Sequence, residues 1–213
     1  MKQVIGILSM LLGMICSMNA QESNVMKLVA PAKSGGKPMM QVFNDRRSGR
    51  EFAPGKLNPQ DLSNLLWAAN GINRADGKRT APSCRNFQEV EVYVLLEEGA
   101  YVYDAKGHAL NLVATGDHRA AIAAGQDFAK TAPVGIVLVA DLSRFGGEIN
   151  EEVKLMASVD VGIVCQNINI ACAGLGLTTV PRASMDKAAL KKILGLKDTH
   201  LLLMNNPVGY PKK

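Results

Sequence analysis

Three arginines lie within five residues in the stretch NDRRSGREF, residues 44–52, where Arg46, Arg47 and Arg50 surround Ser48. An arginine side chain is always charged and can grip a phosphate through two parallel hydrogen bonds, and a neighbouring serine hydroxyl can complete such a site. Taken alone, the stretch allows three uses: a solvated basic face, a patch for nucleic acid or another polyanion, or a pocket for one small anionic ligand.

Two further segments favour the pocket. Residues 80–88, TAPSCRNFQ, are rich in small polar groups and stand just before an apolar strand, and residues 175–185, LGLTTVPRASM, follow a long apolar helix in an extended run. Loops at the ends of strands, held by a rigid core, are where ligands are commonly bound. Together with the arginines, these segments indicate a ligand pocket more than a solvated face.

The sequence lacks the usual catalytic signatures. It contains no Gly-x-Ser-x-Gly elbow, no His-Glu-x-x-His and no phosphate loop ending in Gly-Lys-Ser/Thr. His108, His118 and His200 are scattered, and we predict a structural or surface role for each. The Gly-Leu-Gly at 174–176 leads out of a helix, which indicates a helix C-cap rather than a dinucleotide-binding turn. The cysteines show no metal-type spacing, so no metal site is expected.

The first twenty residues differ from the rest. A lysine at position 2 precedes an apolar run over residues 4–15, and a small and polar stretch ends at Ala20. This pattern predicts a cleavable signal peptide over residues 1–20, export and a periplasmic location. The apolar run is shorter than the ~20 residues of a membrane span, so we expect no membrane span after cleavage. Lipoprotein anchoring through Cys16 is the weaker alternative, because the bulky Ile15 fits a lipidation site poorly.

The composition is that of an ordinary globular protein. The chain has 213 residues, of which 47% are hydrophobic and 20% charged, and this length suits one packed domain of the usual ~100–200 residues. A formal net charge of +5 is mild, and it fits solubility and small anionic ligands as well as it fits nucleic acid. Because an exported protein seldom meets nucleic acid, we expect no nucleic-acid partner.

Hydrophobic periodicity predicts the elements that would position these residues. Residues 21–40 carry no sustained period and contain Pro31, Gly35 and Gly36, which indicates a flexible arm or linker before one domain over residues 41–213. Helices are predicted over residues 38–45, 58–71, 115–130, 148–174 and 184–195, and strands over residues 89–96, 100–104, 134–141 and 200–210. This order indicates an α+β fold with a mixed or antiparallel sheet under helices.

The predicted helix over residues 148–174 is apolar almost all round, like a membrane span. Polar side chains near its middle would be costly in lipid; they are Asp160, Gln166, Asn167 and Asn169. We therefore expect a helix that is buried in the protein core or in a subunit interface.

Four motifs resemble those of the FMN-dependent nitroreductase family. Residues 46–52 resemble its Arg-x-Ser-x-Arg-x-Phe signature, and residues 82–88 resemble its Pro-Ser-x-x-Asn-x-Gln loop. Residues 174–181 resemble the exit from its long helix, and residues 206–211 its closing Pro-Val-Gly-Tyr-Pro strand. Each motif is weak alone, but the four in this order are fairly specific, and the likeness spans about residues 40–211.

The resemblance implies a fold, a cofactor and a reaction. The expected protein is an α+β homodimer with a mostly antiparallel central sheet flanked by helices, a long buried helix at the dimer interface, and one FMN at each of two subunit interfaces. It would take a hydride from NADH or NADPH and pass it through flavin N5 to a nitroaromatic, quinone or similar acceptor, by a ping-pong mechanism. The protein need not then supply a nucleophile, which explains why catalytic triads are missing.

The resemblance also implies roles for individual residues. Arg46, Arg47 and Ser48 would hold the phosphate and ribityl end of FMN, and Arg50 would approach the pyrimidine edge of the ring. Hydride arriving at N5 leaves negative charge at N1 and the C2 carbonyl, so a fixed guanidinium there favours the reduced form. The other expected cofactor-binding residues are Pro82, Ser83, Asn86 and Gln88, of which the last two would come from the partner chain, Pro181, Arg182, Ala183 and Ser184 along the ring beside N5, and Lys212 or Lys213 at the phosphate.

Two rival functions fit part of the same pattern. One is an exported flavin-binding redox protein that does not use NAD(P)H, since pyridine nucleotides are scarce outside the cytoplasm. The other is a non-enzymatic module that binds polyanions through the basic cluster. A flavin spectrum that NADH or NADPH bleaches separates the main prediction from both.

Overall fold

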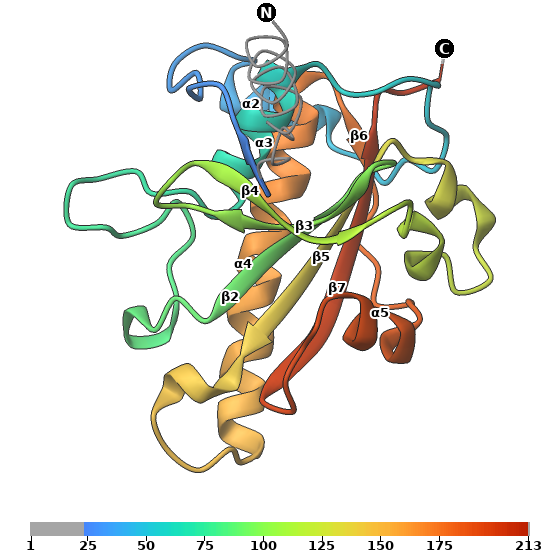
Figure 1. Cartoon of the computed structure of the whole chain (residues 1–213). Helices are drawn as coiled ribbons and strands as arrows, with labels where there is room; N and C mark the ends of the chain where they lie inside the picture. The colour runs from blue at the N-terminus through green and yellow to red at the C-terminus, as the bar shows by residue number, and fades with distance from the viewer. Residues whose placement is uncertain (1–23, 213) are drawn as a thin grey trace, which may run out of the picture.

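A seven-stranded sheet forms the centre of the molecule, and every neighbouring pair of its strands is antiparallel (Figure 1). The computed structural model describes residues 24–212, so the signal predicted over residues 1–20 lies outside the described residues. The strand order is β1-β4-β3-β2-β5-β7-β6, with β1 (Val25–Lys27), β2 (Val90–Leu95), β3 (Gly99–Asp104), β4 (Ala109–Thr115), β5 (Val134–Asp141), β6 (Thr178–Thr179) and β7 (His200–Gly209). The predicted α+β fold with a mostly antiparallel sheet is confirmed.

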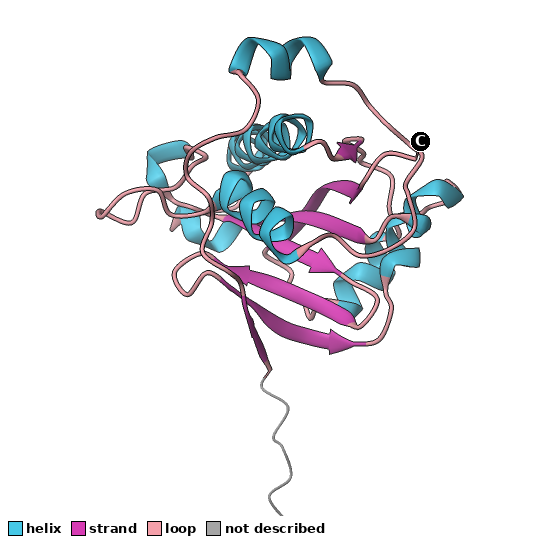
Figure 2. Cartoon of the chain, turned by 90° about the horizontal axis from the view of Figure 1, so that it is seen from above, coloured by secondary structure: helices cyan, strands magenta, loops and turns pink. Residues whose placement is uncertain are grey.

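Helices cover both faces of this sheet (Figure 2). The α-helices of the described part are α2 (Met39–Asp45), α3 (Pro59–Asn70), α4 (Glu151–Leu175) and α5 (Lys187–Ile193). Because side chains alternate along a strand, Val94 and Leu138 pack with α3 and α4 in one core, whereas Leu95 and Val137 pack with α5 in a second core. Strand β5, which is buried at every position except Asp141, lies between the two cores, as predicted for a doubly buried strand.

Local capping signals set the helix ends. The side chain of Asn58 accepts a hydrogen bond from the Asp61 amide at 2.7 Å, Pro59 takes the first helical position, and α3 ends at Gly71, as predicted. Helix α4 begins at Glu151 rather than at residue 148, because the side chain of Asn150 caps it. The other end of α4 closes at a left-handed Gly176 with φ 72°, the expected C-cap.

Helix α4 is buried along one side only. By length and composition it is the one helix of residues 24–212 that could cross a membrane. Its buried side packs on α3 and the sheet and includes Asp160 and Asn169, whereas Leu155 and Val159 are 59% and 49% exposed. The helix is thus a core element with an apolar outer stripe on its first half.

The segment over residues 115–130 is not the predicted helix. It forms two short 3-10 turns, Arg119–Ile122 and Asp127–Thr131, with Ala124 and Gly125 at positive φ between them. The alanine content favours a helix locally, but the left-handed pair reverses the chain and prevents a continuous one. The strand β4 just before it was not predicted, since ALNLVAT lacks clean alternation.

Part of the predicted flexible arm is a strand. Within residues 21–40, β1 pairs with β4, and the Gln60 side chain donates to the carbonyl of Ala30 at 2.9 Å. Three residues are too short for a periodic signal, so this strand depends on the backbone hydrogen bonds that the β4 edge offers. The segment Val25–Lys27 is therefore an edge of the sheet.

Candidate functional site

The arginine stretch runs in an extended form between β6 and the end of the chain. Ser48 forms a parallel bridge with Thr179, and the Gly49 amide donates to the Thr179 carbonyl at 2.9 Å. Four residues later, Phe52 bridges Pro211. Contacts with Thr179 and Pro211 therefore hold the backbone of the stretch in place, and its side chains project from this fixed backbone.

The absence of a side chain at Gly49 permits this close approach. A Cβ at that position would collide with the hydroxyl of Thr178. Glycine is the residue that lets two backbones approach in this way. The Gly between Ser48 and Arg50 therefore fixes the distance of the stretch from β6.

Arg46 and Arg47 line a cavity of about 540 Å³ at the last turn of α4. Both side chains belong to exposed residues, and neither they nor Arg50 forms an ion pair with any residue of the described chain. The nearby Asp45 is instead engaged by Lys37 at 2.9 Å, and this hydrogen bond lowers its pKa. The cavity thus offers two guanidinium groups that form no ion pair with a described carboxylate, and Asp45, which also lines it, is bonded to Lys37.

Arg50 lies at the far side of the stretch, beside an aromatic ring. Its guanidinium carbon is 5.9 Å from the centroid of Phe128, and that of Arg182 is 5.4 Å from the same centroid. Burial lowers the pKa of Arg182, and the charge of Arg50 lowers it further. Two guanidinium groups thus share one ring, and the exposed one, Arg50, is available to a ligand.

Hydrogen bonds within the chain engage the side chain of Arg182. It donates to the carbonyls of Ile122 and Ala123, to Asn205 Oδ1 at 3.0 Å and to Gln126 Oε1 at 3.2 Å. These bonds fasten residues 122–126 to the sheet, and the predicted place of Arg182 beside the cofactor ring stays a prediction. The neighbouring residues that were predicted with it are exposed; they are Pro181, Ala183 and Ser184.

The loop over residues 82–88 lies at the opposite end of the sheet from the arginines (Figure 1). Gln88 lies two residues before Val90, which pairs with Ala140 near the end of β5. Ser48 bridges Thr179 at the other end, because Thr179 pairs with Val208 and Val208 pairs with Val134 at the start of β5. These positions are separated by the length of β5, roughly 20 Å at 3.3 Å per residue. A single chain therefore does not bring Arg46 and Asn86 together.

Backbone strain marks this loop. Arg85, Asn86 and Gln88 have φ of 46°, 59° and 53°, a backbone region that residues other than glycine seldom adopt. The Ser83 hydroxyl accepts from the Gln88 amide at 2.9 Å and stabilises the turn. Such strain of about 1 kcal/mol or more per residue gathers at functional sites, and here it presents Pro82 and Asn86 to solvent.

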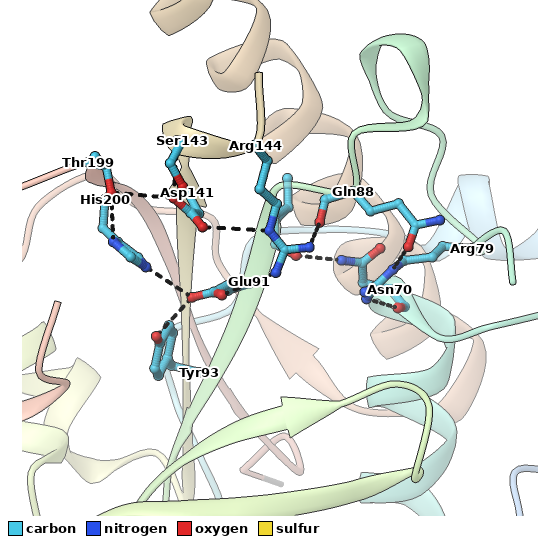
Figure 3. Close-up of polar contacts among 11 residues, drawn as sticks. Asn70, Arg79, Gln88, Glu91, Tyr93, Asp141, Ser143, Arg144, Thr199 and His200 are labelled. Atoms are coloured by element: carbon cyan, nitrogen blue, oxygen red, sulfur yellow. Dashed lines mark hydrogen bonds and ion pairs between the residues drawn. The ribbon is translucent and has the colours of Figure 1, made fainter. Parts of the chain in front are cut away.

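Hydrogen bonds within the chain already hold the Gln88 side chain (Figure 3). Its Oε1 accepts from Arg79 Nε at 3.0 Å, and its Nε2 donates to Asn86 Oδ1 and to the Gly77 carbonyl, each at 3.2 Å. Arg144 holds the Gln88 carbonyl at 3.1 Å. Gln88 therefore supports the loop, and Asn86 is its more exposed polar side chain.

A buried carboxyl group that the sequence did not reveal lies next to this loop. Glu89 is fully buried, and apart from the neighbouring Asp160 carboxyl its carboxyl oxygens have no hydrogen-bond partner in the described part of the chain. Burial, and then the neighbouring Asp160 carboxyl, raise its pKa to about 7. Asp160 accepts from the Cys84 amide at 2.7 Å and so joins the loop to α4. In sequence, Glu89 looked only like the first residue of a strand.

The end of the chain returns to the arginine stretch. The Lys212 amide donates to the Glu51 carbonyl at 3.3 Å, and Pro211 lines the same cavity as Arg46 and Arg47. Lys212 is thus near the predicted phosphate site, and the prediction for Lys213 lies outside the described residues. Sequence reasoning also missed Phe128, because its segment was predicted as a helix, and the cluster Glu91, Asp141 and His200, whose members come from three strands.

Comparisons with known proteins agree with the fold and the motifs. The family model described as the nitroreductase family matches residues 44–210. A protein of Methanocaldococcus jannaschii, named as a candidate nitroreductase, is 32% identical over 177 residues, covering 79% of this chain and 88% of that protein. A crystal structure of a candidate nitroreductase from Ralstonia eutropha JMP134 has 32% identity and a TM-score of 0.84, covering 91% of this chain and 92% of that one.

A more distant structure shares the fold. The NADPH:FMN oxidoreductase from Vibrio harveyi, in complex with NAD⁺, is 20% identical with a TM-score of 0.61, covering 82% of this chain and 69% of that one. The family match, which extends over most of the chain, and the two relatives at 32% identity carry the assignment. The chain belongs to the nitroreductase family and shares its general role, that of a flavin oxidoreductase.

Proposed function

We propose that the protein is an FMN-dependent oxidoreductase that takes a hydride from NADH or NADPH and passes it to a nitroaromatic, quinone or similar acceptor in a ping-pong reaction. The observation that carries the proposal is the cavity with Arg46 and Arg47, whose guanidinium groups form no ion pair within residues 24–212. The name of the Vibrio harveyi protein, an NADPH:FMN oxidoreductase of the same fold, supports the choice of FMN and a pyridine nucleotide.

The residues present fit the phosphate end of FMN. Two guanidinium groups supply bidentate donors to a dianionic phosphate, and the exposed Ser48 adds a hydroxyl. The cavity of about 540 Å³ lies within the usual range of small-molecule sites, and the Gly49 contact with Thr178 keeps its wall close to β6. When bound, FMN would supply the hydride-transfer chemistry at N5.

Arg50 would act on the ring rather than on the phosphate. Its guanidinium is held over Phe128, on the same backbone wall as Arg46 but beyond Gly49. A fixed positive charge at the pyrimidine edge stabilises the negative charge that reduction leaves at N1 and the C2 carbonyl. The backbone of residues 181–184, which pairs with β7 through Arg182 and Asn205, would support the N5 side.

A homodimer would complete the site. Exposed apolar side chains lie near both ends of α4. Leu155 and Val159 are on its first half. Helix α2, which packs on the last turns of α4, carries Met39, Met40 and Phe43. If two α4 helices pair in antiparallel fashion, the first half of one meets α2 of the other. The loop at Asn86, tied to α4 through Asp160, would then reach the partner's arginine stretch.

The visible spectrum of the purified full chain tests the cofactor and the donor. We expect a yellow protein with one FMN per chain that NADH or NADPH bleaches under anaerobic conditions and that a quinone or nitroaromatic restores. A yellow protein that neither nucleotide bleaches would instead be a flavin-binding redox protein with another electron donor. A colourless protein that does not take up added FMN would contradict both functions and leave polyanion binding.

The cellular location is a separate proposal. The signal-like pattern of residues 1–20 supports export to the periplasm. Detection of the mature protein in the periplasmic fraction, shortened by about twenty residues in its mass, tests this. A full-length cytoplasmic protein would contradict it without affecting the proposed reaction.

A further inference from the structure

Three side chains that can ligate a metal converge where β2, β5 and β7 lie side by side (Figure 3). Glu91 belongs to β2, Asp141 ends β5, and His200 begins β7 directly opposite Asp141. One ligand atom from each residue lies within 4.8 Å of the other two. The cluster occupies the end of the sheet opposite to Arg46 and Arg47 of the same chain.

The imidazole of His200 is oriented towards the two carboxylates. Its side chain is only 10% exposed, and Nε2 faces Glu91 Oε2 at 3.5 Å. No hydrogen bond to Nε2 is formed by the residues that the structure describes, whereas Nδ1 faces the hydroxyl of Thr199 at 3.5 Å. A proton on Nδ1 would leave the lone pair of Nε2 directed at the cluster, as in histidine ligands whose second nitrogen is held by an oxygen.

Both carboxylates are held in place by hydroxyl groups. Tyr93 donates to Glu91 Oε2 at 2.9 Å, and the Ser143 hydroxyl donates to Asp141 Oδ1 at 2.6 Å. The two acidic groups are therefore oriented before any cation arrives.

Arg144 counters this negative charge only in part. Its guanidinium is 3.6 Å from Glu91 and 3.6 Å from Asp141, longer than the ~2.7–2.9 Å of a charged hydrogen bond. The side chain is 40% exposed and also donates to the Gln88 carbonyl at 3.1 Å. Two carboxylates against one guanidinium leave one net negative charge beside the imidazole of His200.

We propose that Glu91, Asp141 and His200 form a binding site for a first-row divalent cation of the Zn²⁺ type. Ligand atoms lie about 2.0–2.2 Å from Zn²⁺, which puts two of them roughly 3.4 Å apart at a tetrahedral angle. The 3.5 Å between His200 Nε2 and Glu91 Oε2 already matches this spacing, and the third ligand atom, from Asp141, lies within 4.8 Å of the other two. An imidazole among the ligands favours Zn²⁺ over Mg²⁺ or Ca²⁺.

Water would complete the coordination. A cavity of about 340 Å³, lined by Glu91 and Arg144 among others, lies beside the cluster. Three protein ligands and an open fourth position are the pattern of solvent-accessible zinc sites. Distance along the chain, from residue 91 to residue 200, hides this set from any search for a short metal motif.

Isothermal titration of the chelator-treated full chain with Zn²⁺ tests the proposal. We expect one ion per chain in the wild type, about 100-fold weaker binding in His200→Gln and in Glu91→Gln, and tighter binding in Arg144→Gln because a competing charge is removed. Two variants, each folded by circular dichroism, separate this site from adventitious ones: His118→Gln removes another imidazole and Cys84→Ser removes the half-buried thiol. Both should bind as the wild type does.

Cobalt substitution identifies the ligands independently of affinity. A Co²⁺ complex at the cluster should show visible d–d bands without the thiolate charge-transfer band, and Glu91→Gln should lose them even if His200→Gln fails to fold. The proposal would be overturned if Zn²⁺ binding survives in both Glu91→Gln and His200→Gln, or if it disappears in Cys84→Ser. The lack of binding in both the wild type and Arg144→Gln would also overturn it.

Discussion

The two ends of β5 differ in how their charges are balanced. At the Val134 end, the guanidinium groups of Arg46, Arg47 and Arg50 form no ion pair within the described chain. At the Asp141 end, Arg144 contacts two carboxylates and Arg79 is held by Gln88 Oε1 and the Asn70 carbonyl (Figure 3). Arginines that no described carboxylate pairs are open to an anionic ligand, whereas arginines that are already paired shape a surface. On this basis we assign the flavin phosphate to the first end.

The second end also stores backbone strain and a buried acid. Three residues of the loop over residues 82–88 have positive φ, and Glu89 is buried with the Asp160 carboxyl beside it. Both features cost stability and are retained next to α4. In the proposed dimer this rigid loop completes the site that the partner's arginines begin.

Removal of the uncompensated charge should have the largest effect. Each charged hydrogen bond to a phosphate contributes about 1.5–3 kcal/mol, so Arg46→Gln combined with Arg47→Gln should weaken FMN binding by about 100-fold or more. Quenching of flavin fluorescence measures the affinity. Arg74→Gln, which changes an exposed arginine 4.0 Å from Asp76, is the matched control and should bind as the wild type does. Equal affinities in all three proteins would contradict the assignment.

A side chain at Gly49 should move the arginine stretch away from β6. The added Cβ of Gly49→Ala meets the Thr178 hydroxyl, so the free energy of unfolding should fall by about 1–3 kcal/mol and FMN affinity with it. Thr178→Ala in the same chain should restore part of both. Gly147→Ala, where a Cβ meets nothing within 4 Å, is the control. If the effects of Gly49→Ala and Thr178→Ala simply add, this contact is not the cause of the lost stability and affinity.

The buried acid at the other end should make stability depend on pH. Its folded pKa of about 7 lies above the ordinary 4.5, so the folded chain binds more protons between these values and stability falls as pH rises through them. The loss from about pH 5 to pH 8 should be ~1–3 kcal/mol, and Glu89→Gln should remove most of it. Urea unfolding at both pH values measures this. An identical loss in the variant would assign the effect to other groups.

Arg50 should affect the redox property rather than binding. Arg50→Gln should keep FMN bound but lower its reduction potential by about 30 mV or more, which is ~1.4 kcal/mol for two electrons. Arg50→Lys keeps the charge and should recover part of the potential. Anaerobic reduction against a reference dye gives the value. An unchanged potential in Arg50→Gln would mean that this guanidinium does not lie at the pyrimidine edge.

Elements with local signals were predictable from the sequence. The cap at Asn58, the apolar β5 and the left-handed Gly176 each depend on residues close in the chain, and each was placed within a few residues. In contrast, β1 and β4 form because each offers the other a backbone edge, and residues 115–130 turn at Ala124 despite their helical composition. Pairing between distant segments leaves little trace in local periodicity.

The candidate site was also predictable only where its residues lie close together in the sequence. The arginine stretch was identified from residue types and from its resemblance to a family motif, but the hydrogen bonds of the Arg182 side chain could not be predicted because its partners, Ile122 and Asn205, are far from it in sequence. Glu91, Asp141 and His200 were missed for the same reason. Chemistry carried by one segment is visible in a sequence, and chemistry assembled across strands requires the fold.

A mixed dimer tests most directly whether opposite ends of two chains form one flavin site. One chain would carry Arg46→Gln with Arg47→Gln, and the other Asn86→Asp, so a shared site would pair the two defects in one pocket and leave the second pocket intact. We predict that each parent dimer binds FMN poorly and that the purified mixed dimer binds one FMN per dimer with wild-type affinity. A mixed dimer that binds as poorly as its parents would place each site within a single chain and contradict the account.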